Sequence, residues 1–174
     1  MEKITSRIIT IIFIAIFLFQ SFKDERAVAH TKKSRTTNNS AMVSRVIDGD
    51  TIELSTGEKV RYIGINTPET VHPSKAVQCF GEEAAAKNKE LVLGKEVILK
   101  KDVSNKDKYG RLLRYVYLND GTMVNNLLVK NGYAFASAYP PDIKYQLTFE
   151  SSEKEARENN LGLWENICDY TDAK

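Results

Sequence analysis

Polar side chains that could take part in catalysis stand in separate stretches of this 174-residue chain. They are three carboxylates and two arginines: Asp48, Asp50, Arg61, Glu69 and Arg111. Taken singly, each stretch is typical of an ordinary turn or of an outward-facing strand residue. Taken together, they are what hydrolysis of a phosphodiester requires. Arginine guanidinium groups, with their paired N–H donors, neutralise the charge that develops on the phosphoryl group. A carboxylate positions or deprotonates the attacking water.

A hard divalent cation would complete this chemistry, and it needs oxygen ligands. Asp50, Asn66 and a backbone carbonyl have suitable oxygens, although oxygen ligands alone do not choose among calcium, magnesium and manganese. The Asp48–Gly49–Asp50 turn is not an EF-hand loop, because such a loop needs further acids and a glutamate at its twelfth position. Two histidines and two widely separated cysteines do not make a four-ligand zinc set.

The elements that must position these residues follow from local patterns. Short runs rich in β-branched and aromatic residues predict five strands, over 42–47, 51–54, 59–65, 97–101 and 112–118. Apolar residues at helical spacing and glycine stop signals predict three helices, over 81–93, 123–131 and 145–159. Strands with one helix between the third and fourth, and helices at the end, predict an α+β fold, a five-stranded OB-type barrel with three helices.

The first 29 residues have the pattern of an export signal. Lys3 and Arg7 precede a mostly apolar run over 8–19, and a small-x-small site ends at Ala29. As a helix, this run is about 18 Å long, which is short for a bilayer core of about 30 Å. We expect a signal peptide, although the charged stretch 23–26 leaves an uncleaved membrane anchor open. The mature protein is then secreted, or tethered to the outer face of the membrane through residues 1–29.

Residues 30–41 lack apolar periodicity and predict a disordered basic linker. This leaves 42–174 as one folded domain with a modest core. The chain's net charge of +2 comes from its first 41 residues, which have 7 basic and 3 acidic residues. The remainder has 18 basic and 20 acidic residues, a net charge of −2. Bulk charge therefore gives no support for nucleic-acid binding, and any such function must depend on a local site.

The chain has two cysteines, Cys79 and Cys168. Outside the cytosol an even pair favours one disulfide. Two unpaired thiols are the open alternative.

Several strings resemble the staphylococcal nuclease family, in the same order and at similar spacing. They are IDGDT (47–51), INTPET (65–70), HPSKAVQCFGEEA (72–84), DKYGR (107–111) and DGTMVN (120–125). The resemblance covers most of residues 43–165. It implies an OB barrel with three helices, dependence on one calcium ion, and endonucleolytic hydrolysis of both DNA and RNA. We expect the protein to act as a monomer.

The resemblance also implies a role for each matching position. Asp50 is a calcium ligand, Asn66 occupies the other carboxylate position of the calcium site, and Thr67 lends its backbone carbonyl. Glu69 orients or deprotonates the attacking water. Arg61 and Arg111, the second of them in the DKYGR string, hold the phosphate and stabilise the transition state.

Three further positions follow from the same resemblance. Asp48 is expected to lie next to the calcium ligands without contacting the ion itself. Lys108 and Tyr109 match positions that contact a nucleotide's terminal phosphate. The family's base-stacking tyrosines do not align cleanly, and either Tyr139 or Tyr145 could replace them or pack structurally.

Asn66 is the main departure from the family pattern, which has aspartate there. Because an amide oxygen has no net charge, we predict weaker calcium binding. A non-catalytic OB-fold module that binds nucleic acid or protein is the alternative function. The joint presence of Arg61, Glu69 and Arg111 beside Asp50 favours the enzyme, because a binding module does not need all three.

Overall fold

The chain's structure is a computed structural model in which residues 39–70, 77–165 and 168 are described. The predicted signal peptide or anchor lies outside these residues, as does most of the predicted linker. Within the described ranges, no helix has the length and apolar character needed to cross a membrane. The predicted linker ends earlier than expected, because Ser40 and Ala41 already belong to the first strand. Their pairing with Ile98 and Val97 draws them into the sheet.

Five strands form a closed barrel in the order β1-β2-β3-β6-β5. They are β1 (Ser40–Asp48), β2 (Thr51–Leu54), β3 (Lys59–Tyr62), β5 (Glu96–Lys100) and β6 (Leu112–Tyr117). Every neighbouring pair is antiparallel except β3 and β6, which run parallel. The predicted α+β fold, an OB-type barrel with three helices, is confirmed.

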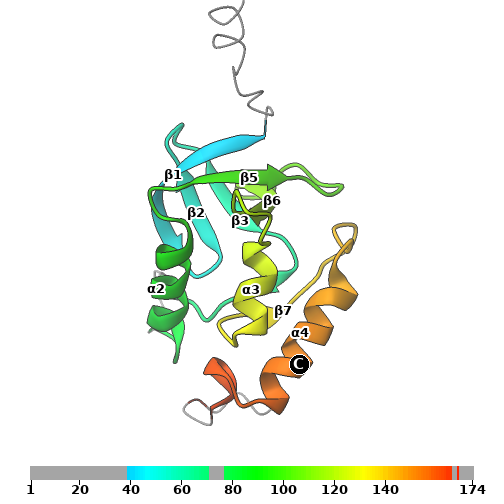
Figure 1. Cartoon of the computed structure of the whole chain (residues 1–174). Helices are drawn as coiled ribbons and strands as arrows, with labels where there is room; N and C mark the ends of the chain where they lie inside the picture. Colours follow the sequence, from blue (N-terminus) through cyan, green and yellow to red (C-terminus); the bar gives the residue numbers. More distant parts are fainter. Residues whose placement is uncertain (1–38, 71–76, 166–167, 169–174) are drawn as a thin grey trace, which may run out of the picture. The chain divides into compact units, whose positions relative to one another are not determined.

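The described residues include three α-helices, α2 (Gly81–Val92), α3 (Val124–Lys130) and α4 (Gln146–Glu158), and α3 lies between the other two (Figure 1). A polar side chain ties the middle helix to the barrel. Asn125 accepts a hydrogen bond from the Val116 N–H at 2.8 Å and donates one to the Ile63 carbonyl at 2.9 Å. Because Asn125 is fully buried, both bonds compensate for the desolvation of its amide.

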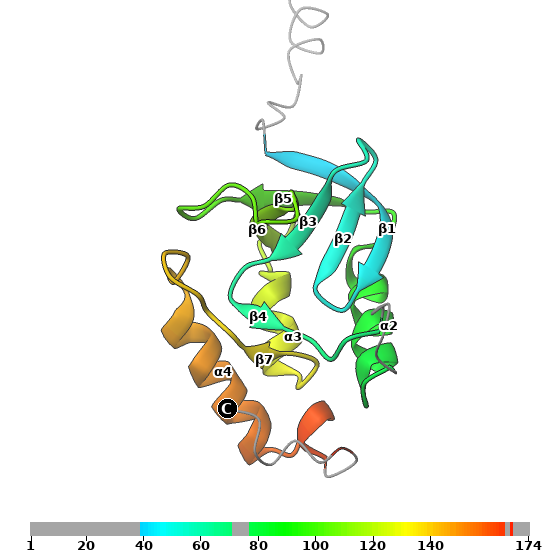
Figure 2. The same cartoon turned by 180° about the vertical axis from the view of Figure 1, so that it is seen from behind.

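The single strand predicted over 59–65 is wrong, because the chain turns at Ile63–Gly64. Gly64 has φ +79°, and a Cβ there would collide with the ring of Phe149 on α4. After the turn, β4 (Ile65–Asn66) pairs with β7 (Phe135–Ala136), a short strand that local patterns did not predict (Figure 2). The turn places Asn66 outside the barrel wall, where it is exposed. A short 3-10 helix, η1 (Gly162–Trp164), follows α4.

Candidate active site

The acidic turn between β1 and β2 holds Asp50 in a buried position. The residue is only 4% exposed. Its Oδ2 accepts a hydrogen bond from the Thr67 N–H at 2.9 Å and pairs with Nη1 of Arg61 at 2.7 Å. Burial raises the pKa of Asp50 above its ordinary value, and the Arg61 guanidinium opposes that shift. The turn is thereby joined to β3 and to the segment after β4.

Arg61 lies on β3 between the buried side chains of Val60 and Tyr62, and its own side chain is 17% exposed. Besides the ion pair with Asp50, its Nη2 donates to Asn66 Oδ1 at 2.9 Å and its Nη1 to the Ile65 carbonyl at 3.1 Å. The Tyr62 carbonyl is a fourth acceptor for this guanidinium. Four acceptors fix its orientation more firmly than one ion pair would. Arg61 is therefore a preoriented fork that links Asp50 to Asn66.

Thr67 packs tightly beneath the acidic turn. A Cβ on Gly49 would lie 2.7 Å from Thr67 Oγ1, so this position requires glycine because of the close approach. Thr67 is buried, and its hydroxyl has no hydrogen-bond partner among the residues described. An unsatisfied buried hydroxyl is costly, and it stands beside a buried carboxylate.

These oxygens have the chemistry that a hard cation prefers. Asp50 offers a carboxylate, Asn66 an amide oxygen, and Thr67 a carbonyl and the unpaired hydroxyl. The oxygens of Asp50 and Asn66 that bond to Arg61 retain further lone pairs. In the described part of the chain, no group of three or more His, Cys, Asp or Glu side chains could hold a metal. A site built from these residues would instead combine one carboxylate with neutral oxygens, which suits a hard divalent ion and gives it one formal negative charge.

Glu69 lies on the segment that follows β4, and it approaches Asp48. Burial raises the pKa of Asp48, and the neighbouring Glu69 carboxyl raises it further against hydrogen bonds that lower it. Those opposing bonds come from the Gly49 N–H at 2.7 Å and the Thr70 hydroxyl at 3.1 Å. Glu69 therefore lies close enough to Asp48 for the two carboxyl groups to interact.

Arg111 is held by Asp107 in the turn before β6. Asp107 Oδ2 pairs with Nε of Arg111 at 2.6 Å, while Oδ1 accepts the backbone N–H groups of Tyr109 and Arg111 at 2.9 and 3.0 Å. One carboxylate therefore fixes both the turn and the guanidinium that the turn carries.

A cavity of about 760 Å³ brings the two arginines together. The parallel pairing of β3 with β6 sets Arg61 opposite Leu113. Arg111 directly precedes β6, and both arginines line the cavity. The cavity is lined by cationic, aromatic and amide side chains, among them Arg61, Asn66, Lys108, Tyr109, Arg111 and Tyr139.

Comparison with known proteins identifies the family of the chain. The sequence model of the family described as "Staphylococcal nuclease homologue" matches residues 59–166. The chain belongs to the staphylococcal nuclease family. It is 42% identical over 171 residues to a thermonuclease of Staphylococcus intermedius, an alignment that covers 95% of this chain and 99% of that protein. It is 38% identical over 170 residues to a thermonuclease of Staphylococcus hyicus, with 95% and 100% covered.

Another relative is the endonuclease YncB of Bacillus subtilis strain 168, which is 40% identical over 151 residues, 84% of this chain and 71% of that protein. The chain is therefore a nuclease, a hydrolase that acts on nucleic acids. This conclusion favours the enzyme over the alternative of a non-catalytic binding module.

The structure separates the two candidate stacking tyrosines of this nuclease. Tyr139 is 76% exposed and lines the cavity. Tyr145 instead packs edge-on against Tyr115, with ring centroids 4.7 Å apart, and accepts a hydrogen bond from the Tyr117 hydroxyl at 3.2 Å. Tyr145 does not line the cavity, and its position is that of a packing residue at the start of α4.

Asp50, Thr67 and Glu69 are not part of the cavity's described lining, and Arg61 connects them to it. Local patterns did not point to Asp107, although an aspartate whose side chain accepts backbone N–H groups a few residues later is a known turn signal.

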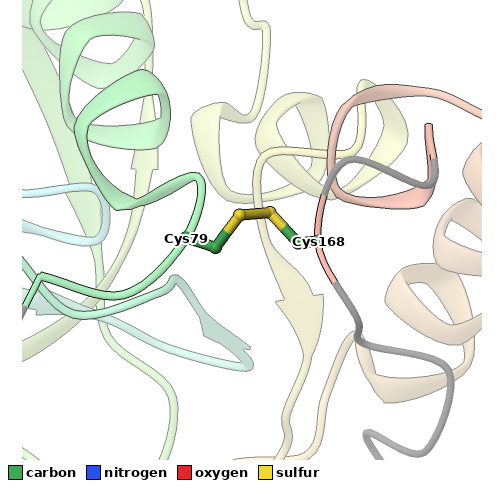
Figure 3. Close-up of a disulfide and its surroundings, with 2 residues drawn as sticks. All are labelled: Cys79 and Cys168. Carbon is green, nitrogen blue, oxygen red and sulfur yellow. A yellow bond between two sulfur atoms is a disulfide. The ribbon is translucent and has the colours of Figure 1, made fainter.

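The two cysteines of the nuclease form a disulfide, with their Cα atoms 5.9 Å apart (Figure 3).

Proposed function

We propose that this nuclease is an exported, calcium-dependent endonuclease that hydrolyses DNA and RNA, with Arg61 and Arg111 on the phosphate and Glu69 on the attacking water. One observation carries the proposal. Two guanidinium groups from distant parts of the chain line one cavity, and one of them also contacts Asp50 and Asn66, two oxygen ligands suited to a hard cation.

The arginines supply electrostatic stabilisation without reorganising. Asp50 and Asn66 hold the Arg61 fork, and Asp107 holds Arg111. Donors that are fixed before the reaction stabilise the charge of the transition state more than mobile ones do. In the cavity they donate hydrogen bonds to the non-bridging oxygens of the scissile phosphate. Lys108 and Tyr109 bind a terminal phosphate, and the exposed ring of Tyr139 stacks on a base.

Asp50, Asn66 and Thr67 would hold one calcium ion. When bound, that ion polarises a phosphoryl oxygen and neutralises part of its charge. Glu69 orients the attacking water or accepts its proton. Asp48 lies close to Glu69, and the neighbouring Glu69 carboxyl is one cause of its raised pKa.

Export is part of the proposal. A disulfide between Cys79 and Cys168 is typical of an oxidising compartment, and residues 1–29 have a signal-like pattern. The protein is then secreted as a monomer, or tethered to the outer face of the membrane if residues 1–29 stay attached.

Cleavage of plasmid DNA and of RNA, measured with calcium, with magnesium and with a chelator, tests the proposed function. We expect calcium-dependent cleavage of both substrates. Glu69→Gln should lower the rate by about a hundredfold or more and keep the melting temperature, and Arg111→Ala should lower the rate by a similar factor. Arg45→Ala is the matched control, because Arg45 also pairs with a carboxylate, Glu53, at 2.7 Å but does not line the cavity. Oligonucleotide binding without calcium-dependent cleavage would favour the binding module instead.

A further inference from the structure

The backbone of Glu69 lies outside regular secondary structure, on the segment between β4 and α2. A catalytic carboxylate there needs another support, because a misplacement of about 1 Å can cost up to a hundredfold in rate. Gln78 makes two hydrogen bonds to this one residue. The Gln78 side-chain oxygen accepts the Glu69 N–H at 2.7 Å, and the Gln78 N–H donates to the Glu69 carbonyl at 2.9 Å.

We propose that Gln78 is a positioning residue that holds Glu69 for water activation, and that the Cys79–Cys168 disulfide anchors Gln78. The inference rests on the proposed role of Glu69. The N–H and the carbonyl of Glu69 are both hydrogen-bonded to Gln78. A movement of Gln78 would therefore shift the backbone of Glu69, and its carboxylate would move with it.

The start of α2 packs closely against the same segment. A Cβ on Gly81 would lie 3.2 Å from the carbonyl oxygens of both Glu69 and Pro68. The Gly81 N–H also donates to the Gln78 carbonyl at 3.0 Å. Between them Phe80 has φ +65°, a left-handed conformation that is uncommon for a residue with a side chain. Glycine and the left-handed turn together allow Gln78 and the helix to approach Glu69 closely.

The disulfide adds a second attachment from far along the chain. Cys79 follows Gln78 directly, and Cys168 is 89 positions away, beyond η1 (Figure 3). The η1 segment is itself fixed to the helical layer, because the Leu163 N–H donates to the Gly132 carbonyl at 2.8 Å. The disulfide therefore links the support of Glu69 covalently to Cys168, a buried residue far along the chain, so that this support does not depend on neighbouring loop residues alone.

Steady-state cleavage by the full chain tests the role of Gln78. Gln78→Met keeps the length of the side chain and removes the acceptor, whereas Gln78→Glu keeps an acceptor oxygen. We expect Gln78→Met to lower kcat about five- to tenfold with KM unchanged, and Gln78→Glu to retain most of the rate. Gln146→Met is the matched control, because its amide bonds to the exposed Glu150 on α4. An unchanged kcat for Gln78→Met, or an equal loss in Gln146→Met, would overturn the proposal.

A second measurement asks whether Gln78 acts through Glu69. In a Glu69→Gln background, Gln78→Met should cause no further loss of kcat, because the carboxylate it positions is already gone. The same fold-loss in both backgrounds would mean a merely structural effect and would overturn the proposal.

Amide hydrogen exchange provides a readout that does not depend on cleavage. The Glu69 N–H should exchange about fivefold faster in Gln78→Met. It should also exchange faster in the Cys79→Ser/Cys168→Ser double variant. Unchanged exchange in Gln78→Met would overturn the role of Gln78, and unchanged exchange in the double variant would overturn the anchoring role of the disulfide. If the wild type failed to cleave, the proposed function would fail, and exchange would still decide whether Gln78 holds Glu69.

Discussion

Asn66 is the position at which a single charge should change calcium affinity most. Its Oδ1 accepts a hydrogen bond from Arg61 at 2.9 Å, and the residue is exposed. A unit charge about 4 Å from another is worth about 1 to 4 kcal/mol, depending on screening. Because Asn66 is exposed, the lower part of this range applies, and the two charges of calcium double it to about 2 kcal/mol. Competition from Arg61 for the new carboxylate removes up to about 1 kcal/mol, which leaves about 1 to 2 kcal/mol. We therefore expect Asn66→Asp to bind calcium about tenfold more tightly.

Calcium titration by calorimetry, without nucleic acid, measures this effect directly. Asn105→Asp is a closely matched control, because Asn105 is also exposed and its Oδ1 accepts a hydrogen bond from Arg114 at the same 2.9 Å. The control adds an equal charge beside an arginine, away from the cavity lining. An equal or weaker calcium affinity for Asn66→Asp would refute the reasoning. So would the same gain in Asn105→Asp, because the effect would then come from overall charge.

Three other changes test separate parts of the structure. Burial raises the pKa of Asp107, but hydrogen bonds from its arginine partner outweigh burial and hold the pKa below the ordinary 3.8. A lowered carboxyl pKa stabilises the fold above that value, and this contribution is lost as the pH falls through the folded-state pKa. Asp107→Asn should therefore lower the melting temperature at pH 7, by an amount that shrinks below pH 3.8; a constant difference would contradict this. Tyr139→Ala should raise KM about tenfold through lost stacking, whereas Tyr145→Ala should mainly lower the melting temperature; equal effects on KM would contradict this assignment. The Cys79→Ser/Cys168→Ser variant should lose up to about 4 to 5 kcal/mol of unfolding free energy in a denaturant titration, and a loss below about 1 kcal/mol would refute the chain-entropy estimate.

The strands of the barrel could be predicted because their sequence patterns are set by residues that are neighbours in the chain. Short β-branched runs separated by turn residues indicated five strands, and helical spacing indicated three helices close to where α2, α3 and α4 occur. The prediction failed at the strand 59–65. The turn at Gly64 depends on the ring of Phe149, which lies far away in the sequence, and no local pattern reports such a contact.

The family-like strings by themselves determined which residue types could cut a phosphodiester, and they identified Arg61, Glu69 and Arg111 as candidates. Only the tertiary structure decided how these residues are supported. The contact of Gln78 with Glu69 involves a side chain whose partner depends on the folded backbone. The same holds for the parallel pairing of β3 with β6, which brings Arg61 and the start of β6 side by side, so that Arg61 and Arg111 line one cavity. Strand propensity arises from neighbouring residues, but the cavity arises from pairings across the fold, and that is why the sequence indicated the chemistry and the structure decided its geometry.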